Sequence, residues 1–273
     1  MIINASNTIY NILLQSAMLA GKEYYPLPNT TLNEKFKIYP NYTPDPYIYP
    51  TLNLITIGIG NPISKDLNLL NFKKSIHSPI DGALYNHAPL LIKPIDIELT
   101  GYESSIYRLK TIVNIDGKDY QCFYGIKINN IIYENEINIM KLSDITTGRV
   151  KYDTFTDTKI LNPDPTNILD VRELTDKAII NVMKIVVEMN QTIVDNMSNA
   201  IKLLYDIDDY VINEIGVCTG IDVKIDESYT ESMWTQINYF VSTDLARNII
   251  YQIVKDDMLY IDVGGMMPIL FNR

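Results

Sequence analysis

The chain has 273 residues, 47% of them hydrophobic, which is enough for one large domain or two small ones with a buried core. Its net charge is −10, and an acidic chain gains nothing from the counterion release that drives nucleic-acid binding. The same charge disfavours an anionic membrane surface. No apolar run is long enough to span a bilayer, and the N-terminus lacks the features of a signal peptide.

The first predicted element is a helix from Ser6 to Ala20, where apolar residues recur at spacings of three and four. Hydroxyl and amide side chains precede it as N-cap candidates, and Gly21 follows it as a C-terminal glycine.

An extended arm is predicted from Lys22 to Pro50, because its repeated prolines prevent a helix. Tyrosines interleave with these prolines, which is not typical of a disordered linker. We expect the arm to pack on a surface of its own chain or of a neighbour. Four tyrosines are the candidate subunit contacts: Tyr39, Tyr42, Tyr47 and Tyr49.

A β-rich part is predicted to follow, with apolar and polar residues alternating. Its expected strands are Leu52–Ile59, Leu90–Leu99, Tyr107–Ile115, Asp119–Ile128 and Ile131–Tyr133. Asp116-Gly117 is a two-residue turn typical of a hairpin, and Asn129-Asn130 suggests a second turn of the same kind. The last three strands are therefore predicted to form an antiparallel meander.

Helical spacing is the pattern after Asn162. Apolar residues from Val171 to Ile215 recur about every 3.67 residues, close to the helical period. An unbroken helix of this length would measure about 66 Å, whereas a compact chain of this size has a radius of gyration of about 18–19 Å. Either the helix breaks, near Asn196–Asn199 or Asp206–Asp209, or it projects and needs a partner.

The remaining expected elements complete an α+β fold, an antiparallel β-rich part followed by long helices. They are a strand at Val217–Ile225, a helix at Glu231–Lys255 and a strand at Met258–Val263 that turns at Gly264-Gly265. The predicted division of the chain is residues 1–50 for the N-terminal helix and arm, 51–161 for the β-rich domain, and 162–273 for the helical part with a C-terminal strand.

Gly58-Ile59-Gly60 is the nearest approach to a nucleotide-binding motif. A dinucleotide fingerprint needs a third glycine, but Ile63 stands there, and the Gly-Lys-Ser/Thr of a phosphate loop is absent. The glycines instead indicate a strand end with a tight turn or close packing against a neighbour.

Catalytic and metal-binding residue types are scarce. The two histidines, His77 and His87, lack a nucleophile motif, and His87 is interpreted as a hydrogen-bonding loop residue. Cys122 and Cys218 form no paired motif, and Asp206–Asp209 lacks the glycine of a calcium loop. We therefore expect no enzyme activity, no metal and no cofactor.

Three segments carry a resemblance: YPTLNLITIGIGNP, SPIDGALYNHAPLLI and YRLKTIVNIDGKDYQCFYGIKI. They resemble virion structural proteins of crAss-like tailed bacteriophages of gut Bacteroidales, most closely a ring protein of the head-to-tail connector or tail. The resemblance covers residues 40–150 and includes no catalytic residue.

The resemblance implies a virion part assembled in the host cytoplasm, present as a homo-oligomeric ring that contacts a portal or neighbouring ring proteins and lets double-stranded DNA pass. A baseplate or capsid-associated protein is an alternative within the same class. Two further alternatives are an enzyme with scattered carboxylates, such as a glycosidase, and a monomeric binding module.

Overall fold

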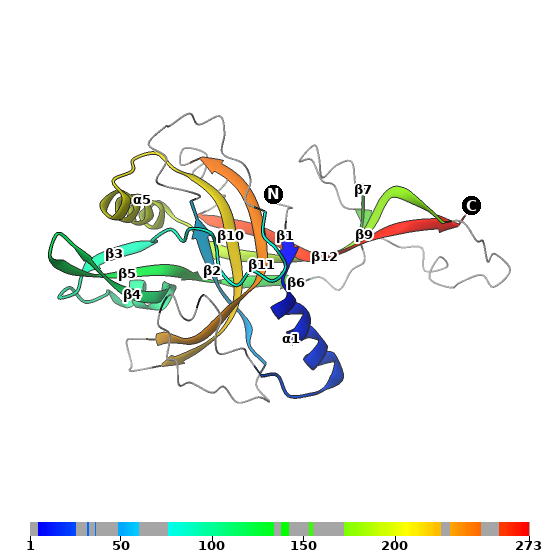
Figure 1. The fold of residues 1–273 in the computed structure, drawn as a ribbon, viewed down its shortest axis with the longest axis horizontal. Helices are drawn as coiled ribbons and strands as arrows, with labels where there is room; N and C mark the ends of the chain where they lie inside the picture. The colour runs from blue at the N-terminus through cyan, green and yellow to red at the C-terminus, as the bar shows by residue number, and fades with distance from the viewer. Residues whose placement is uncertain are drawn as a thin grey trace.

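The computed structural model describes most of the chain. The described residues are 5–25, 32, 36, 49–59, 76–133, 138–141, 153–154, 172–224, 230–246 and 257–272. They form two antiparallel sheets with three helices, and the second sheet crosses the first and extends beyond it along the longest axis of the molecule (Figure 1).

The helices are α1 (Ile9–Ala20), α3 (Gly101–Ile106) and α5 (Gln191–Tyr205). The strands of the first sheet are β1 (Ala5–Asn7), β2 (Thr51–Gly58), β3 (Leu91–Pro94), β4 (Tyr107–Ile115), β5 (Lys118–Lys127), β10 (Val211–Lys224) and β11 (Thr230–Ala246). The strands of the second sheet are β6 (Asn130–Tyr133), β7 (Asn138–Lys141), β8 (Asp153–Thr154), β9 (Arg172–Glu188) and β12 (Met258–Asn272).

The seven-stranded sheet has the order β1-β11-β10-β2-β5-β3, with β4 paired to β5. Its centre is β10, which pairs with β11 on one side and with β2 on the other. Strands far apart in the sequence therefore meet, and Glu214 of β10 lies directly beside Gly58 of β2.

The five-stranded sheet is dominated by a long pair, β9 and β12, which runs out of the body toward the C-terminus (Figure 1). The register extends from Met258 beside Glu188 to Asn272 beside Arg172. On its other side β9 pairs with β6 and β7, whereas β12 is an edge strand of this sheet. We refer to the β9–β12 pair as the arm, which is a different part of the chain from the extended segment predicted at Lys22–Pro50.

The main core lies between the two sheets and α5. Ile55 and Phe123 of the first sheet, Ile185 of the second and Ile193 and Met197 of α5 all belong to one buried cluster. A second cluster covers the other face of the first sheet, where Leu54, Cys122 and Cys218 pack with Leu32 and Phe36. Because the first sheet is covered on both faces, its central strands are buried on both sides.

Local signals explain the elements that the sequence predicts well. The Thr8 hydroxyl accepts a hydrogen bond from the Asn11 amide at 3.3 Å, and Gly21 ends α1 with a φ of 58°. Asp116 and Gly117 have φ values of 51° and 79°, as a hairpin turn of the predicted kind requires. The first helix, the strand beginning near Leu52 and the β4–β5 hairpin are confirmed.

The long helix predicted from Val171 to Ile215 is wrong. The chain forms the extended strand β9, then α5, and then β10. β9 contains Ile179, Ile180 and Ile185, and branching at Cβ favours strands over helices. The predicted break at Asp206–Asp209 does coincide with the end of α5, where Asp206 caps the helix.

The helix predicted at Glu231–Lys255 is also wrong, because its described part belongs to β11. The strand predicted at Val217–Ile225 is confirmed within β10, and the last strand is confirmed but runs straight through Gly264-Gly265 to Asn272. The antiparallel β-rich part of the predicted fold is confirmed, and the long helices predicted after it are wrong.

The predicted third strand of the meander pairs elsewhere. The Ile128 amide donates to the Asn53 carbonyl at 2.8 Å, and the next amide, of Asn129, donates to the Val186 carbonyl at 2.9 Å. The chain therefore crosses from the first sheet to the second at Asn129, and β6 pairs with β9. Strands from all three predicted segments share the first sheet, while the segment boundaries themselves stay a prediction.

Candidate functional site

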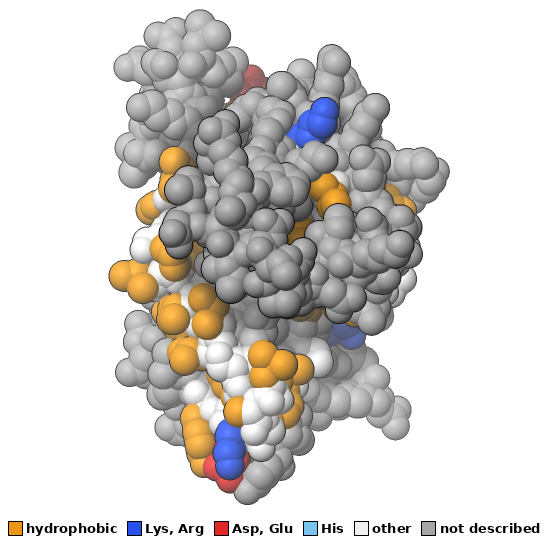
Figure 2. Space-filling view, turned by 90° about the vertical axis from the view of Figure 1, so that its right-hand side faces the viewer, with side chains coloured by type: hydrophobic (Ala, Val, Ile, Leu, Met, Phe, Trp, Pro, Cys, Tyr) orange, Lys and Arg blue, Asp and Glu red, His pale blue; other side chains and the backbone are white. Residues whose placement is uncertain are grey.

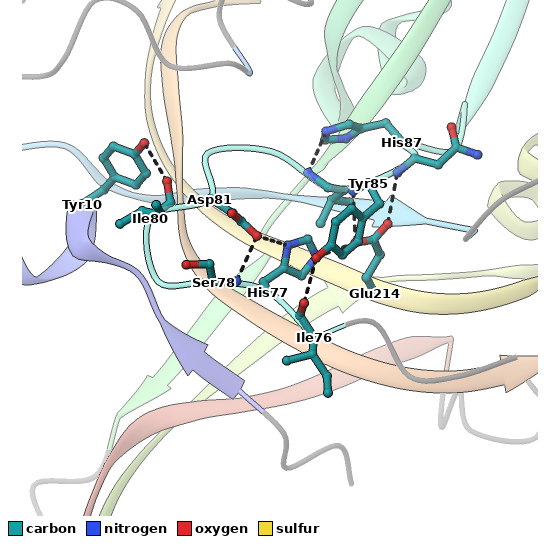
Figure 3. Close-up of polar contacts among 11 residues, drawn as sticks. Tyr10, Ile76, His77, Ser78, Ile80, Asp81, Tyr85, His87 and Glu214 are labelled. Carbon is teal, nitrogen blue, oxygen red and sulfur yellow. Dashed lines mark hydrogen bonds and ion pairs between the residues drawn. The ribbon is translucent and has the colours of Figure 1, made fainter.

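The most concentrated polar chemistry in the described chain lies where the loop of residues 76–90 crosses β10. This loop connects to β3 and contains both histidines of the protein. Figure 3 shows His77 between Asp81 of the same loop and Glu214 of β10. We call His77, Asp81 and Glu214 the histidine cluster.

His77 contacts a carboxylate through each ring nitrogen. Its Nδ1 lies 3.1 Å from Asp81 Oδ2, and its Nε2 lies 2.5 Å from Glu214 Oε2. The faces of the ring are also covered, since Phe240 stacks on it at 3.8 Å and Tyr85 at 4.5 Å between centroids.

Glu214 is fully buried, and backbone groups surround its carboxylate as well. Its Oε2 accepts from the Tyr85 amide and its Oε1 from the Asn86 amide, both at 3.2 Å. A buried carboxylate is tolerated only when it is paired and hydrogen-bonded in this way. One side chain of β10 therefore fastens both ends of the 77–86 segment.

Asp81 completes the cluster at the surface. Its side chain is 31% exposed, and its Oδ2 also accepts from the Ser78 amide at 2.9 Å. These bonds close a short turn between His77 and Asp81, and they fix the ring of His77 against the loop.

A carboxylate–histidine–carboxylate chain can move a proton, but catalysis also needs a reacting atom within hydrogen-bond reach of the base. The His77 side chain is 1% exposed and that of Glu214 is completely buried. Each polar atom of the pair is engaged by the protein itself. The geometry therefore suits a latch between the loop and β10 better than a site for a substrate.

The other histidine has a structural environment of its own. His87 is fully buried, and its Nε2 accepts from the Leu84 amide at 3.2 Å. Its backbone forms a bridge with Gly58, and the ring of Phe36 meets its ring edge-on at 5.3 Å. The prediction that His87 is a hydrogen-bonding loop residue is confirmed.

The remaining candidate residues are dispersed. Cys122 and Cys218 are buried in the second core cluster, and burial raises the pKa of the Cys122 thiol to about 12. Asp208 of the carboxylate run pairs with Lys202 at the surface. Among the described residues, no group of three or more His, Cys, Asp or Glu side chains could hold a metal ion.

Of the four predicted contact tyrosines, Tyr39, Tyr42 and Tyr47 lie outside the described residues. The Tyr49 hydroxyl donates to the Lys22 carbonyl at 2.7 Å. Its side chain packs against a small cluster formed by Leu14, Tyr24 and Trp234. The end of the predicted Lys22–Pro50 segment thus packs on its own chain. The role of the four tyrosines in subunit contact stays a prediction.

Sequence reasoning missed the histidine cluster. Glu214 is 137 residues from His77, so no spacing along the chain connects them. The available signal was Gly58, where the sequence indicates close packing by a neighbour, and the neighbour is Glu214.

The chain belongs to DUF7208, a family of unknown function, whose model matches residues 3–273. No curated protein and no solved structure matches the chain. In the part of the chain that the structure describes, no helix has the length and apolarity that a membrane crossing requires.

Proposed function

We propose that this chain is a non-enzymatic structural subunit of a tailed-phage virion that assembles into a ring in the head-to-tail connector or tail. The observation that carries the assembly role is the arm, whose edge strand β12 is 15 residues long. Among the described strands, β9 alone forms a ladder with β12, and β1 lies close to β12 without pairing to it, so no described strand pairs with the outer edge of β12. Such an edge is a template for a strand of another chain.

The sequence of β12 supports pairing with a neighbour. Natural monomers protect long edges with charges and prolines, whereas β12 has no charged residue after Asp262 and a single proline, Pro268. A strand that adds to this edge meets no like charge, although the whole chain carries a charge of −10. If the edge pairs with a different edge of the next copy, the contact is head-to-tail, and it forms a ring when the rotation between copies closes and a filament when it does not.

The orientation of the free donors follows from Pro268. This residue faces Ala178 of β9 and has no N–H, so its nitrogen belongs on the side away from β9. Because strand geometry repeats every two residues, the Met266 amide is directed to the outer edge as well. The Met267 amide is directed toward β9.

The test is native mass spectrometry and negative-stain microscopy of the purified full chain, alone and mixed with its portal protein. We expect closed rings of many copies. Met266→Pro removes one outer donor and is expected to reduce the ring fraction, whereas Met266→Ala keeps that donor and is expected to assemble. A chain that stays monomeric both alone and in the presence of the portal protein contradicts the ring.

DNA passage is the second part of the proposal, and the acidic balance of the chain supports it. Duplex DNA carries about one negative charge per 1.7 Å, so a basic channel would hold it through many contacts. An acidic channel repels DNA and keeps it centred, over a screening length of roughly 8–10 Å. A reconstruction of the ring tests this, because a channel lined mainly by Lys and Arg contradicts it.

The long helix predicted from Val171 to Ile215 is not formed, and the β9–β12 arm is the element that projects from the body (Figure 1). A baseplate or capsid-associated position remains the alternative within the virion, and peptide mass spectrometry of dissected particles separates these positions. The glycosidase alternative finds no support in the histidine cluster, where Glu214 is closed to solvent.

A further inference from the structure

The neighbours of β9 change at one level of the second sheet. On the side away from β12, the ladder between β9 and β6 ends at Met183, and the ladder between β9 and β7 begins at Ile180. The described register therefore skips two residues of β9 between the two ladders. Among the described strands, only β9 and β12 continue through this level.

The edge strand has two glycines at the same level. In β12, Gly264 is the register partner of Val182, and Gly265 is that of Asn181. Glycine has no Cβ, so its backbone dihedrals are the least restricted and it offers no side chain to pack against the neighbouring strand. A glycine inside a strand weakens that strand. β12 is therefore weakest where β9 changes its neighbours.

The main core ends one register pair before these glycines. Val263 is buried in this core, and its partner Met183 packs against it from a partly buried position. Farther out along the arm, no described residue of β9 or β12 belongs to the main core. Ala178 is fully buried there, with Met140 of β7 and Pro268 of β12 as its register partners. The outer part of the arm thus has packing of its own.

We propose that the arm has a hinge at the level of Gly264 and Gly265, about which its outer part turns as a unit relative to the body. The outer part consists of β7, β8, residues 172–180 of β9 and residues 266–272 of β12. Hinges are short segments that absorb changes in backbone dihedrals between units that stay packed. Three features meet at this level, because the ladders along β9 are interrupted, β12 lacks side chains and the main core ends.

A fixed bend is the alternative, since a bulge also interrupts a ladder and redirects a strand. β6 ends at Tyr133 and β7 begins at Asn138, which leaves four residues between them against two on β9. The glycines favour the hinge over the fixed bend. A sheet that keeps one bent shape is stabilised by side chains that pack across neighbouring strands, and Gly264 and Gly265 provide none.

The outer part extends far enough for a small rotation to be measured. Lys141 of β7 is the register partner of Lys177, which lies five residues from Val182 along β9. This separation is about 17 Å at 3.4 Å per residue, so a rotation of about 20° moves that point by roughly 6 Å. Figure 1 shows the arm extending from the body, and Figure 2 views the molecule from that end.

Double electron–electron resonance on the full chain tests the hinge. Both native cysteines are buried, so spin labels are attached to introduced cysteines, and the labelled chain is diluted with unlabelled chain so that only distances within one copy are measured. Three exposed positions serve: Leu203 of α5, Lys141 of the outer part and Ile132 of β6. The distance distribution of Leu203→Cys with Lys141→Cys is expected to be about twice as wide as that of Leu203→Cys with Ile132→Cys.

The variant Gly264→Val with Gly265→Val tests the position of the hinge. Branched side chains stiffen a strand, so the distribution to Lys141→Cys is expected to narrow to the width of the distribution to Ile132→Cys. Met266→Val with Met267→Val is the matched control, because it places the same side chains on the next two residues of β12 and keeps both glycines. This control is expected to leave the distribution wide. Circular dichroism confirms that both variants fold.

Two outcomes would overturn the hinge. One is a distribution to Lys141→Cys that is as narrow as the distribution to Ile132→Cys in the chain with both glycines, a measurement that needs no change at the hinge itself. The other is equal widths for the two valine variants. The hinge does not depend on the ring: a rigid arm in assembled rings overturns the hinge alone, and a hinged arm in a chain that forms no rings overturns the proposed function alone.

Discussion

A Cβ atom built on Gly58 would lie 2.6 Å from Glu214 Cδ, so the glycine leaves the space that the buried carboxylate occupies. The two residues are partners in the β2–β10 ladder, and the Glu214 side chain passes over Gly58 to reach His77. Gly58 is thus required by packing, and it makes room for the residue that fastens the 77–86 loop.

Gly58→Ala is expected to lower the free energy of unfolding by roughly 1–3 kcal/mol, because the added methyl group overpacks a site that cannot expand. Gly101→Ala is the control, since a Cβ at that position meets no atom within 4 Å. Urea denaturation of both variants measures the difference. Equal stabilities for the two variants would show that Glu214 can move away from Gly58.

Glu214→Gln is expected to destabilise the fold by about 3–5 kcal/mol, because it breaks the buried pair between His77 and Glu214. Asp208→Asn breaks a comparable pair at the surface, where Lys202 and Asp208 are 60% and 71% exposed. That control is expected to cost less than about 1 kcal/mol. Thermal or urea denaturation separates the two, and a small effect of Glu214→Gln would count against the latch.

Elements with local signals could be predicted from the sequence. α1 has Thr8 as its N-cap and Gly21 as its C-cap, and the β4–β5 turn needs the two residues Asp116 and Gly117. These signals act between neighbours, so they do not depend on the rest of the fold.

The strands β9 and β11 could not be predicted in this way, because burial on both faces removes the alternation that marks a strand. β11 has Thr235, Gln236 and Asn238 fully buried beside its apolar residues. Two of these polar side chains bond across the sheet to β10: the Thr219 amide donates to Asn238 Oδ1 at 3.0 Å, and Thr235 Oγ1 donates to the Thr219 carbonyl at 3.1 Å. Apolar spacing in β9 and β11 then imitates a helix, and only strand pairing over long distances decides the outcome.

The histidine cluster could not be predicted from the sequence either, because its residues meet only in the folded structure. Tertiary structure brings Glu214 to His77 across 137 residues, and the sequence around each residue contains no motif. Gly58 alone pointed to a close neighbour, without indicating which one.

Both cysteines are expected to resist thiol reagents in the folded protein. Cys122 and Cys218 are fully buried, and burial raises the pKa of both thiols, for Cys122 to about 12. The reactive thiolate is therefore scarce near neutral pH. Iodoacetamide labelling at pH 8 followed by mass spectrometry is expected to modify neither cysteine until urea unfolds the chain. Rapid labelling of either one without denaturant would contradict the buried cores described above.

The buried carboxyl group of Asp262 makes the free energy of unfolding depend on pH. The residue is 7% exposed in β12, and burial raises its pKa above the ordinary value of 3.8, while the attraction of Lys184 opposes the shift. A carboxyl with a raised pKa binds its proton more tightly in the folded state than in the unfolded chain. Its contribution to stability is therefore fully present below the ordinary value, and it is lost as the pH rises through the raised one.

Asp262→Asn removes this loss of stability, because the side-chain amide of asparagine stays neutral at every pH. The stability of the variant relative to the natural chain is expected to increase as the pH rises above the ordinary pKa of 3.8 and to level off above the raised pKa of the folded state. Urea denaturation at several pH values in that range measures the trend. A difference that stays constant with pH would show that Asp262 titrates alike in both states, and a falling difference would show that attraction to Lys184 outweighs burial.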